Sequence, residues 1–472
     1  MRTMVLPSFD IPRVRSVAIG VRKICLLLLA SLLPSRTPAQ SFQDIKPSPP
    51  QLQWQDLEIG VILHFSTNTF LNREWGDGTA SPSVFNPAHV DTDQWMQAAR
   101  AAGAKYAVLV AKHHDGFALF PSAHTDYSVK SSPWLNGRGD LVRLASDSAR
   151  KAGLGFGIYL SPWDRHDSRY PDPKAYDAYY LSQLTELASH YGPLTEFWLD
   201  GAGSEGRTYD FDTIVQKLRT YQPNTLVFAD VALYKNADIR WVGSEDGTVP
   251  YENWNVIDRS GYLRWRPIEA DTPLRKLHWF WHPNDESSLL SVDELLDIYT
   301  RTVGRGAQLM LGLAPDNTGR LPDADVARLR EFGEAVQRLY STNLALKAMH
   351  PSKAPSDAAI DNNPATFWSA PERHATLELQ FDKPVTFDRA VTMEWLNEGQ
   401  RIEEYSIEAW QNGAWRSLVH AHAIGHKKID LFPATTTQRV RLNLLSTVGS
   451  AAIREFQLYD GASSVKSSTP GK

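Results

Sequence analysis

Two short motifs each contain a carboxylate that could take part in catalysis. Asp200 lies in the motif FWLDGA and Glu245 in the motif RWVGSEDG. Hydrolysis of a glycosidic bond needs two carboxyl groups across the scissile bond, one ionised and one protonated. Each residue also has an ordinary explanation, because an Asp after an apolar run often caps the next helix. For Glu245, the local sequence by itself favours an ordinary surface loop carboxylate.

Other motifs supply polar and aromatic side chains that could surround these two carboxylates. Planar polar groups between aromatic walls suit a neutral polyol such as a sugar ring. The sequence contains neither a glycine-rich phosphate loop nor a serine nucleophile elbow. The set is rich in His, Trp, Arg and carboxylates and comprises His64, Glu74, Trp75, His113, His114, Tyr159, Trp163, Asp164, Arg165, Asp200, Glu245, Glu269, Asp271, Arg275 and Trp279.

Three histidines raise the alternative of a metal-dependent hydrolase, namely His64, His113 and His114. Adjacent residues on a strand point to opposite faces, so His113 and His114 are poorly placed to hold one ion together. The sequence also has no HExxH motif and no cysteine-based site. We therefore expect catalysis to require no metal or other cofactor.

The elements that must position these residues follow the pattern of a parallel barrel between residues 54 and 345. Short β-branched or aromatic runs alternate there with helical segments, as in a (β/α)8-like TIM barrel, whose active-site residues follow the carboxyl ends of the strands. One assumption about the fold thus brings the whole set to one face. The eight expected strands are 61–66, 106–111, 155–160, 196–199, 225–228, 240–242, 278–282 and 308–313.

Helices are expected between most of these strands, several of them opened by a capping Asp or Ser. No helix is expected between the fifth and sixth strands, which predicts an irregular barrel at that point. The Pro- and Gln-rich residues 40–53 are expected to form an extended lead-in. The expected helices are 91–102, 140–152, 173–191, 211–221, 291–303 and 322–340.

Residues 346–460 change to short alternating runs without helices, which predicts a small all-β sandwich. The final residues 461–472 are small and polar and are expected to be disordered. The expected strands lie in the runs ATLELQF at 375, AVTMEW at 390, YSIEAW at 405, RVRLNLL at 439 and IREFQLY at 453.

The composition limits the possible binding partners, and the N-terminal segment indicates where the protein is located. The chain has 472 residues and a formal net charge of −5 from interspersed signs, so it offers no basic face for nucleic acid. Residues 1–39 combine an Arg-rich start with the apolar run 24–33 and predict a signal peptide, hence export to the periplasm or the medium. No run is long enough to span a membrane. The single Cys25 lies within this segment, so the mature protein would contain no cysteine.

Taken together, the motifs resemble glycoside hydrolase family 29, the α-L-fucosidases. The resemblance runs in order across residues 54–340 and rests on HFSTNTF, REWGDG, AKHHDGFALFPS, YSVKSSPW, GDLV, GIYLSPWDR, FWLDGA and RWVGSEDG. It is closest to the subgroup that prefers α1,3/1,4-linked fucose. The resemblance implies a retaining enzyme with Asp200 as nucleophile and Glu245 as acid/base, with Glu269 as a competitor for the second role.

The resemblance also implies which residues hold the sugar. The segment TPLRKLHWFWH departs from the usual SIRPGWFYH of the family, which predicts a differently shaped loop around residues 275–278. For Glu245 to start protonated, burial or a neighbouring carboxylate such as Asp246 must raise its pKa. The implied substrate-binding residues are His64, Glu74, Trp75, His113, His114 and Tyr159, with Arg275 and Trp279 as further walls.

The C-terminal region, with DNNPATFWSA at 361, resembles discoidin-like (F5/8 type C) modules. That resemblance favours a structural role over glycan binding and allows a structural Ca²⁺ ion. The expected partners of the whole chain are fucosylated oligosaccharides or glycoconjugates, and the sequence gives no oligomeric state. The main alternative from another class is a catalytically inactive barrel that only binds glycans.

Overall fold

A computed structural model describes residues 42–256, 263–349 and 355–461 of the chain. The expected signal peptide at 1–39, with Cys25, lies outside the described residues, as does the expected tail beyond residue 461. Among the described residues, no helix combines the length and the apolar character needed to cross a bilayer.

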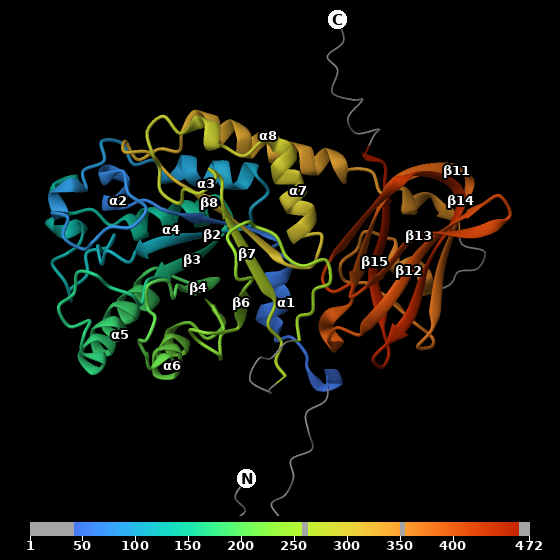
Figure 1. Ribbon diagram of the computed structural model, residues 1–472, viewed down its shortest axis with the longest axis horizontal. Coiled ribbons are helices and arrows are strands. Elements are labelled where there is room, and N and C mark those ends of the chain that lie inside the picture. Colours follow the sequence, from blue (N-terminus) through green and yellow to red (C-terminus); the bar gives the residue numbers. More distant parts are fainter. Residues whose placement is uncertain (1–41, 257–262, 350–354, 462–472) are drawn as a thin grey trace, which may run out of the picture. The chain divides into compact units, whose positions relative to one another are not determined.

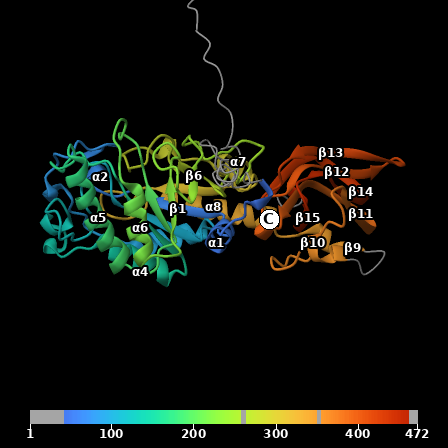
Figure 2. The ribbon, with the colours of Figure 1, turned by 90° about the horizontal axis from the view of Figure 1, so that it is seen from below.

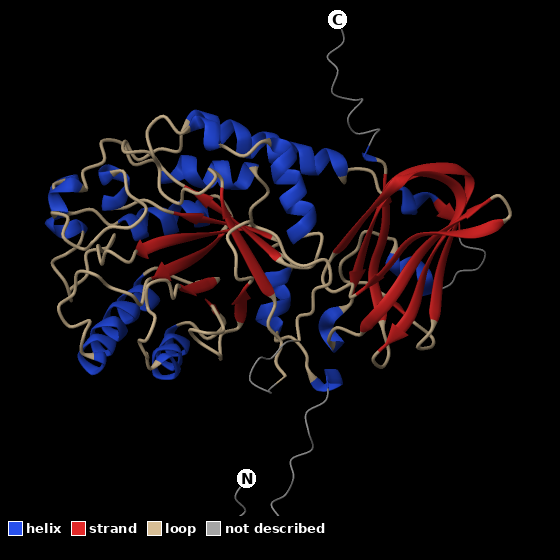
Figure 3. Ribbon diagram, viewed as in Figure 1, coloured by secondary structure: helices blue, strands red, loops and turns tan. Residues whose placement is uncertain are grey.

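Eight parallel strands form a closed barrel, as the sequence predicts (Figure 1, Figure 3). They follow one another in chain order, and β1 closes the barrel against β8 through the pairing of Ile59 with Leu309. Their bounds are β1 Ile59–Leu63, β2 Tyr106–Lys112, β3 Gly155–Leu160, β4 Glu196–Leu199, β5 Leu226–Ala229, β6 Ile239–Trp241, β7 Ile268–Pro273 and β8 Gln308–Leu313.

The seventh strand is the one that the sequence pattern places wrongly. The structure has β7 at Ile268–Pro273, whereas residues 278–282 form a loop after it. The run IEADTP does not look like a buried strand because it contains two acids and a proline. Both acids are nevertheless buried, and aromatic side chains of β2, β4 and β6 donate hydrogen bonds to them across the barrel.

Helices follow most strands, and all six expected helices are confirmed to within two residues at each end. Asp91, Asp140 and Ser291 accept hydrogen bonds from the first turns of their helices, as expected for N-caps. The fully described connection between β5 and β6 contains no helix, which is also as expected. The helices are α1 Pro49–Gln55, α2 Thr67–Leu71, α3 Thr92–Ala101, α4 Leu141–Lys151, α5 Pro173–His190, α6 Phe211–Tyr221, α7 Val292–Thr302 and α8 Asp323–Leu339.

The lead-in is not extended throughout, because α1 occupies its end. Ser48 and Gln51 form a reciprocal capping box, and prolines fill the first helical positions, where the missing N–H costs nothing. The proline-rich composition therefore marks a helix start at this point.

The C-terminal domain is an antiparallel sheet with strand order β10-β15-β11-β14-β12-β13, and β9 pairs with β11. Its strands lie side by side in both views (Figure 1, Figure 2). The expected runs at 375 and 390 belong to one strand, β11, which bends at two register shifts. The bounds are β9 Ala348–Met349, β10 Trp368–Ser369, β11 Ala375–Glu394, β12 Ile402–Gln411, β13 Ala414–His422, β14 Lys428–Thr447 and β15 Ala452–Tyr459.

Candidate active site

A cavity of about 520 Å³ opens where the barrel strands end, and it gathers nearly all the expected site residues. Among the catalytic and substrate-binding residues that the family resemblance implies, Arg275 alone does not line it. Its guanidinium is buried and paired with Asp325 in α8, with Nη2 2.6 Å from Oδ1, so it holds a loop to a helix instead of forming a wall. The expected residues that do line the cavity are His64, Glu74, Trp75, His113, His114, Tyr159, Asp200, Glu245 and Trp279.

Asp200 follows β4 directly and is held by two donors. The Tyr159 hydroxyl donates to Oδ2 at 2.9 Å, and the backbone N–H of Ala202 donates to Oδ1 at 2.9 Å. Burial raises the pKa of Asp200, while these two hydrogen bonds act against the rise by favouring the ionised form. The carboxylate is thus fixed in direction and supported as an anion inside the cavity.

His114 faces Asp200 as a neutral imidazole. The Ser161 hydroxyl donates its only proton to the carbonyl of Trp163 at 2.7 Å, so His114 Nδ1, 2.7 Å from the same hydroxyl, must be the donor to Ser161. Burial, aided by nearby basic groups, lowers the pKa of His114 to about 3. Its bare Nε2 lies 3.5 Å from Asp200 Oδ2 and can accept a hydrogen bond from a substrate hydroxyl. A neutral His114 therefore adds no positive charge beside Asp200.

His64 and His113 are neutral for the same reason. Burial, together with the neighbouring histidine, lowers the pKa of both rings well below the usual value. Neutral imidazoles can both donate to and accept from sugar hydroxyls. In the described part of the chain, no three His, Cys, Asp or Glu side chains are arranged to hold a metal ion.

Glu245 lies in the loop after β6, on the rim of the same cavity. Partial burial and the charges of Asp200 and Glu74 raise the pKa of Glu245, and a hydrogen bond from the Trp279 side chain moderates the rise. Asp246 does not contribute as expected. Its Oδ1 accepts from the backbone and hydroxyl of Thr248, and despite partial burial these hydrogen bonds hold the pKa of Asp246 below its usual value.

Glu269, the competitor for the acid/base role, lies inside the barrel and does not line the cavity. It is fully buried and accepts from the Tyr106 hydroxyl at 2.7 Å and from the Trp198 indole at 2.8 Å. Burial and the nearby Glu196 raise its pKa well above the usual value. The geometry thus favours Glu245 over Glu269 as proton donor.

The floor of the cavity contains residues that were not assigned a role from the sequence. Trp198 and Phe228 stack with ring centroids 3.7 Å apart, and the Trp241 indole donates to Asp271 at 2.6 Å. Trp198 lies in β4, two residues before Asp200, which follows that strand directly. Because side chains two apart share a face, that spacing is the signal that could have identified it.

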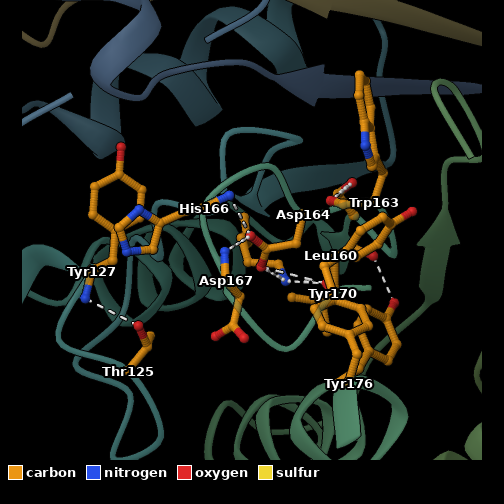
Figure 4. A network of polar contacts seen from close by, with 12 residues as sticks. Thr125, Tyr127, Leu160, Trp163, Asp164, His166, Asp167, Tyr170 and Tyr176 are labelled. Carbon is orange, nitrogen blue, oxygen red and sulfur yellow. Dashed lines mark hydrogen bonds and ion pairs between the residues drawn. The ribbon is translucent and has the colours of Figure 1, made fainter. Parts of the chain in front are cut away.

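A buried polar network beneath the cavity fixes the loop after β3 (Figure 4). Lys112, next to His113, donates to Asp164 at 2.9 Å, and both side chains are almost fully buried. The other oxygen of Asp164 accepts from the backbone N–H groups of His166 and Asp167. The ion pair therefore ties the end of β2 to the loop that carries Trp163 against the cavity wall.

Comparisons with known proteins agree with this geometry. The sequence matches the family described as Alpha-L-fucosidase over residues 35–339 and the F5/8 type C domain over residues 341–456. It is 38% identical to Alpha-L-fucosidase 1 of Arabidopsis thaliana over 417 residues, 81% of each chain. It is 36% identical to Putative alpha-L-fucosidase 1 of Oryza sativa subsp. japonica, covering 89% of this chain and 86% of the relative.

Solved structures show the same similarity over most of the chain. A putative alpha-L-fucosidase from Bacteroides thetaiotaomicron superposes with a TM-score of 0.82 at 33% identity, covering 88% of this chain and 98% of that one. A Ruminococcus gnavus GH29 fucosidase in complex with fucose superposes with a TM-score of 0.80 at 27% identity, covering 90% and 97%.

Proposed function

Because the chain belongs to the α-L-fucosidase family and is a glycoside hydrolase, we propose that it releases terminal α-linked L-fucose by a retaining double displacement. The observation that carries this proposal is that Asp200 and Glu245 line one cavity and interact electrostatically. Hydrogen-bond donors fix Asp200 and favour its ionised form, whereas the pKa of Glu245 is raised, which favours its protonated form. Such a reaction needs one ionised and one protonated carboxyl group.

In the first step, a carboxylate oxygen of Asp200 attacks the anomeric carbon as its bond to the leaving oxygen breaks. Glu245 gives its proton to that oxygen, so the leaving group departs as a neutral alcohol. In the second step, Glu245 takes a proton from water, the water oxygen attacks the anomeric carbon, and Asp200 is released as an anion. The neutral rings of His64, His113 and His114 can bind the sugar hydroxyls without adding charge.

The linkage preference belongs to the same proposal. The motif RWVGSE supports a preference for α1,3- or α1,4-linked fucose on branched glycans, and the wide cavity leaves room for a sugar next to the fucose. Incubation with fucosylated oligosaccharides that differ only in linkage tests this preference. NMR of the first product anomer tests retention, and an inverted anomer would contradict Asp200 as nucleophile.

Replacing Asp200 by Ala gives a direct test of the nucleophile. Turnover of an aryl fucoside should be abolished, and added azide should partly restore it by attacking from the vacated space. Near-normal activity of this variant would contradict the assignment.

We also propose that the C-terminal domain holds a Ca²⁺ ion near Glu455 in β15. This side chain is only 3% exposed, its Oε1 has no partner within the described chain, and it lies close enough to Asp361 for their charges to interact. Asn363 and Thr366 supply further oxygens beside Asp361. Ca²⁺ prefers such oxygen sets, where it would stabilise the fold. Ca²⁺ should therefore raise the Tm of the parent protein over that in a chelator, but not the Tm of Glu455→Gln.

Export remains a proposal that rests on the N-terminal sequence pattern. Determination of the first residue of protein recovered from the periplasm or the medium tests it. Recovery of the intact N-terminus from the cytoplasm would contradict it.

A further inference from the structure

The carboxylate of Glu74 ties the loop after β7 to the loop after β1. The backbone N–H of Trp279 donates to Glu74 Oε2 at 2.9 Å, and the backbone N–H of Phe280 donates to Oε1 at 3.2 Å. A backbone donor moves only with the chain itself. Glu74 therefore sets where residue 279 lies.

His282 completes this arrangement from the end of the same loop. Its Nε2 lies 2.6 Å from Glu74 Oε1, and its Nδ1 lies 2.5 Å from Asn72 Oδ1. Hydrogen bonds to a carboxylate are shorter and stronger than those between neutral groups. His282 thus holds the carboxylate in the direction in which it accepts from Trp279 and Phe280, while His282 itself does not line the cavity.

The indole of Trp279 has little freedom to adjust if its backbone moves. The ring lies directly over Gly312 in β8, where a methyl group would come within 2.6 Å of it. On another side it contacts the His64 ring, with centroids 5.1 Å apart. From this position the indole lines the same cavity as Glu245 and lies close enough to that carboxyl to lower its pKa. The position of one backbone unit therefore decides whether the indole reaches Glu245.

We propose that His282 is a positioning residue for proton transfer by Glu245. It acts through Glu74 and the backbone of Trp279, and the chain of contacts ends at the carboxyl that must face the leaving oxygen. The inference rests on the proposed function in one respect, namely that Glu245 is the proton donor.

Leaving groups that differ in their need for a proton separate this role from a merely structural one. A nitrophenolate departs readily as an anion and gains little from general acid catalysis, whereas a poor leaving group depends on it. Loss of positioning should therefore slow the poor substrate selectively. A general loss of folding or of sugar binding would slow both substrates alike.

The experiment compares kcat/KM of the full chain for 4-nitrophenyl and 4-methoxyphenyl α-L-fucosides. Because general acid catalysis contributes about 10²-fold to 10⁴-fold, partial misplacement in His282→Ala should cost about 10-fold or more on the methoxyphenyl substrate and about 3-fold or less on the nitrophenyl substrate. Glu245→Gln serves as reference and should show a stronger selectivity of the same kind. His282→Gln, which returns a donor near the position of Nε2, should restore most of the parent ratio.

His278→Ala is the matched control. His278 lies in the same loop and makes a comparable contact, with Nδ1 2.8 Å from Asp285 Oδ2, but it does not touch Glu74. Its removal should change both rates by the same small factor.

Equal losses on the two substrates in His282→Ala would overturn the inference. If Glu245→Gln is selective and His282→Ala is not, only the positioning role fails. If Glu245→Gln itself shows no selectivity, the proton-donor assignment fails and this inference with it. Should His282→Ala not fold, His282→Asn replaces it, since its shorter side chain keeps a polar partner for Asn72 without reaching Glu74.

Discussion

Removal of one hydroxyl, in Tyr159→Phe, should change the pH at which the nucleophile becomes available. The Tyr159 hydroxyl donates to Asp200 Oδ2 at 2.9 Å inside the cavity, and this bond favours the ionised carboxylate. Burial already raises the pKa of Asp200, so losing the donor raises it further. Because only the anion attacks, the acidic limb of kcat/KM should move to higher pH.

The size of the effect follows from the type of bond. A hydrogen bond to a charged group contributes about 1.5–3 kcal/mol, which corresponds to a factor of about 10 to 150. The ratio of kcat/KM between the parent and the variant should show this whole factor at pH values below the acidic limb, where Asp200 is mostly protonated in both proteins. Well above the limb both proteins hold the anion, and the remaining loss reports only the orientation of the carboxylate.

The assay is the pH profile of kcat/KM on an aryl fucoside, with Tyr180→Phe as matched control. Tyr180 donates to the Leu160 carbonyl at 2.6 Å and is as deeply buried, but it lies away from the cavity lining. The control should lose about 1 kcal/mol of stability without moving the limb. An unmoved limb in Tyr159→Phe, or an equal movement in both variants, would refute the reasoning.

Three further substitutions test other parts of the site. Gly312→Ala places a methyl group 2.6 Å from the Trp279 ring and should lower kcat/KM without a comparable fall in Tm; an unchanged rate would contradict the packing argument. Lys112→Met leaves Asp164 buried and unpaired, so urea unfolding should show a loss of about 3–5 kcal/mol. Glu269→Gln removes a buried acid whose pKa is raised. As the pH rises, this glutamate ionises in the unfolded chain near its ordinary pKa of 4.5, before it ionises in the folded protein. The free energy of unfolding of the parent protein should therefore fall above pH 4.5, and that of the variant should fall less.

Much of the barrel could be predicted from local patterns because its strands are buried on both faces and read as apolar runs. Its helices begin at capping side chains such as Asp91 and Asp140, which the sequence displays directly. The cavity residues were found because one rule about strand ends applies to all of them. Long-range partners carry no such local signal. Nothing near Arg275 in the sequence points to Asp325, and the wrong role for Arg275 follows from that.

The mistaken seventh strand has a physical cause that also bears on the chemistry. Glu269 and Asp271 lie two apart in β7, so both point into the barrel. Tyr106 and Trp198 donate to the deeper acid, and Trp241 donates to the one that reaches the cavity. Burial raises the pKa of both acids well above the usual value, which favours their neutral forms, and neutral acids cost far less to bury than anions. A strand with two acids therefore behaves as an apolar one, and the aromatic run that resembles a strand is free to form the loop on which Trp279 approaches Glu245.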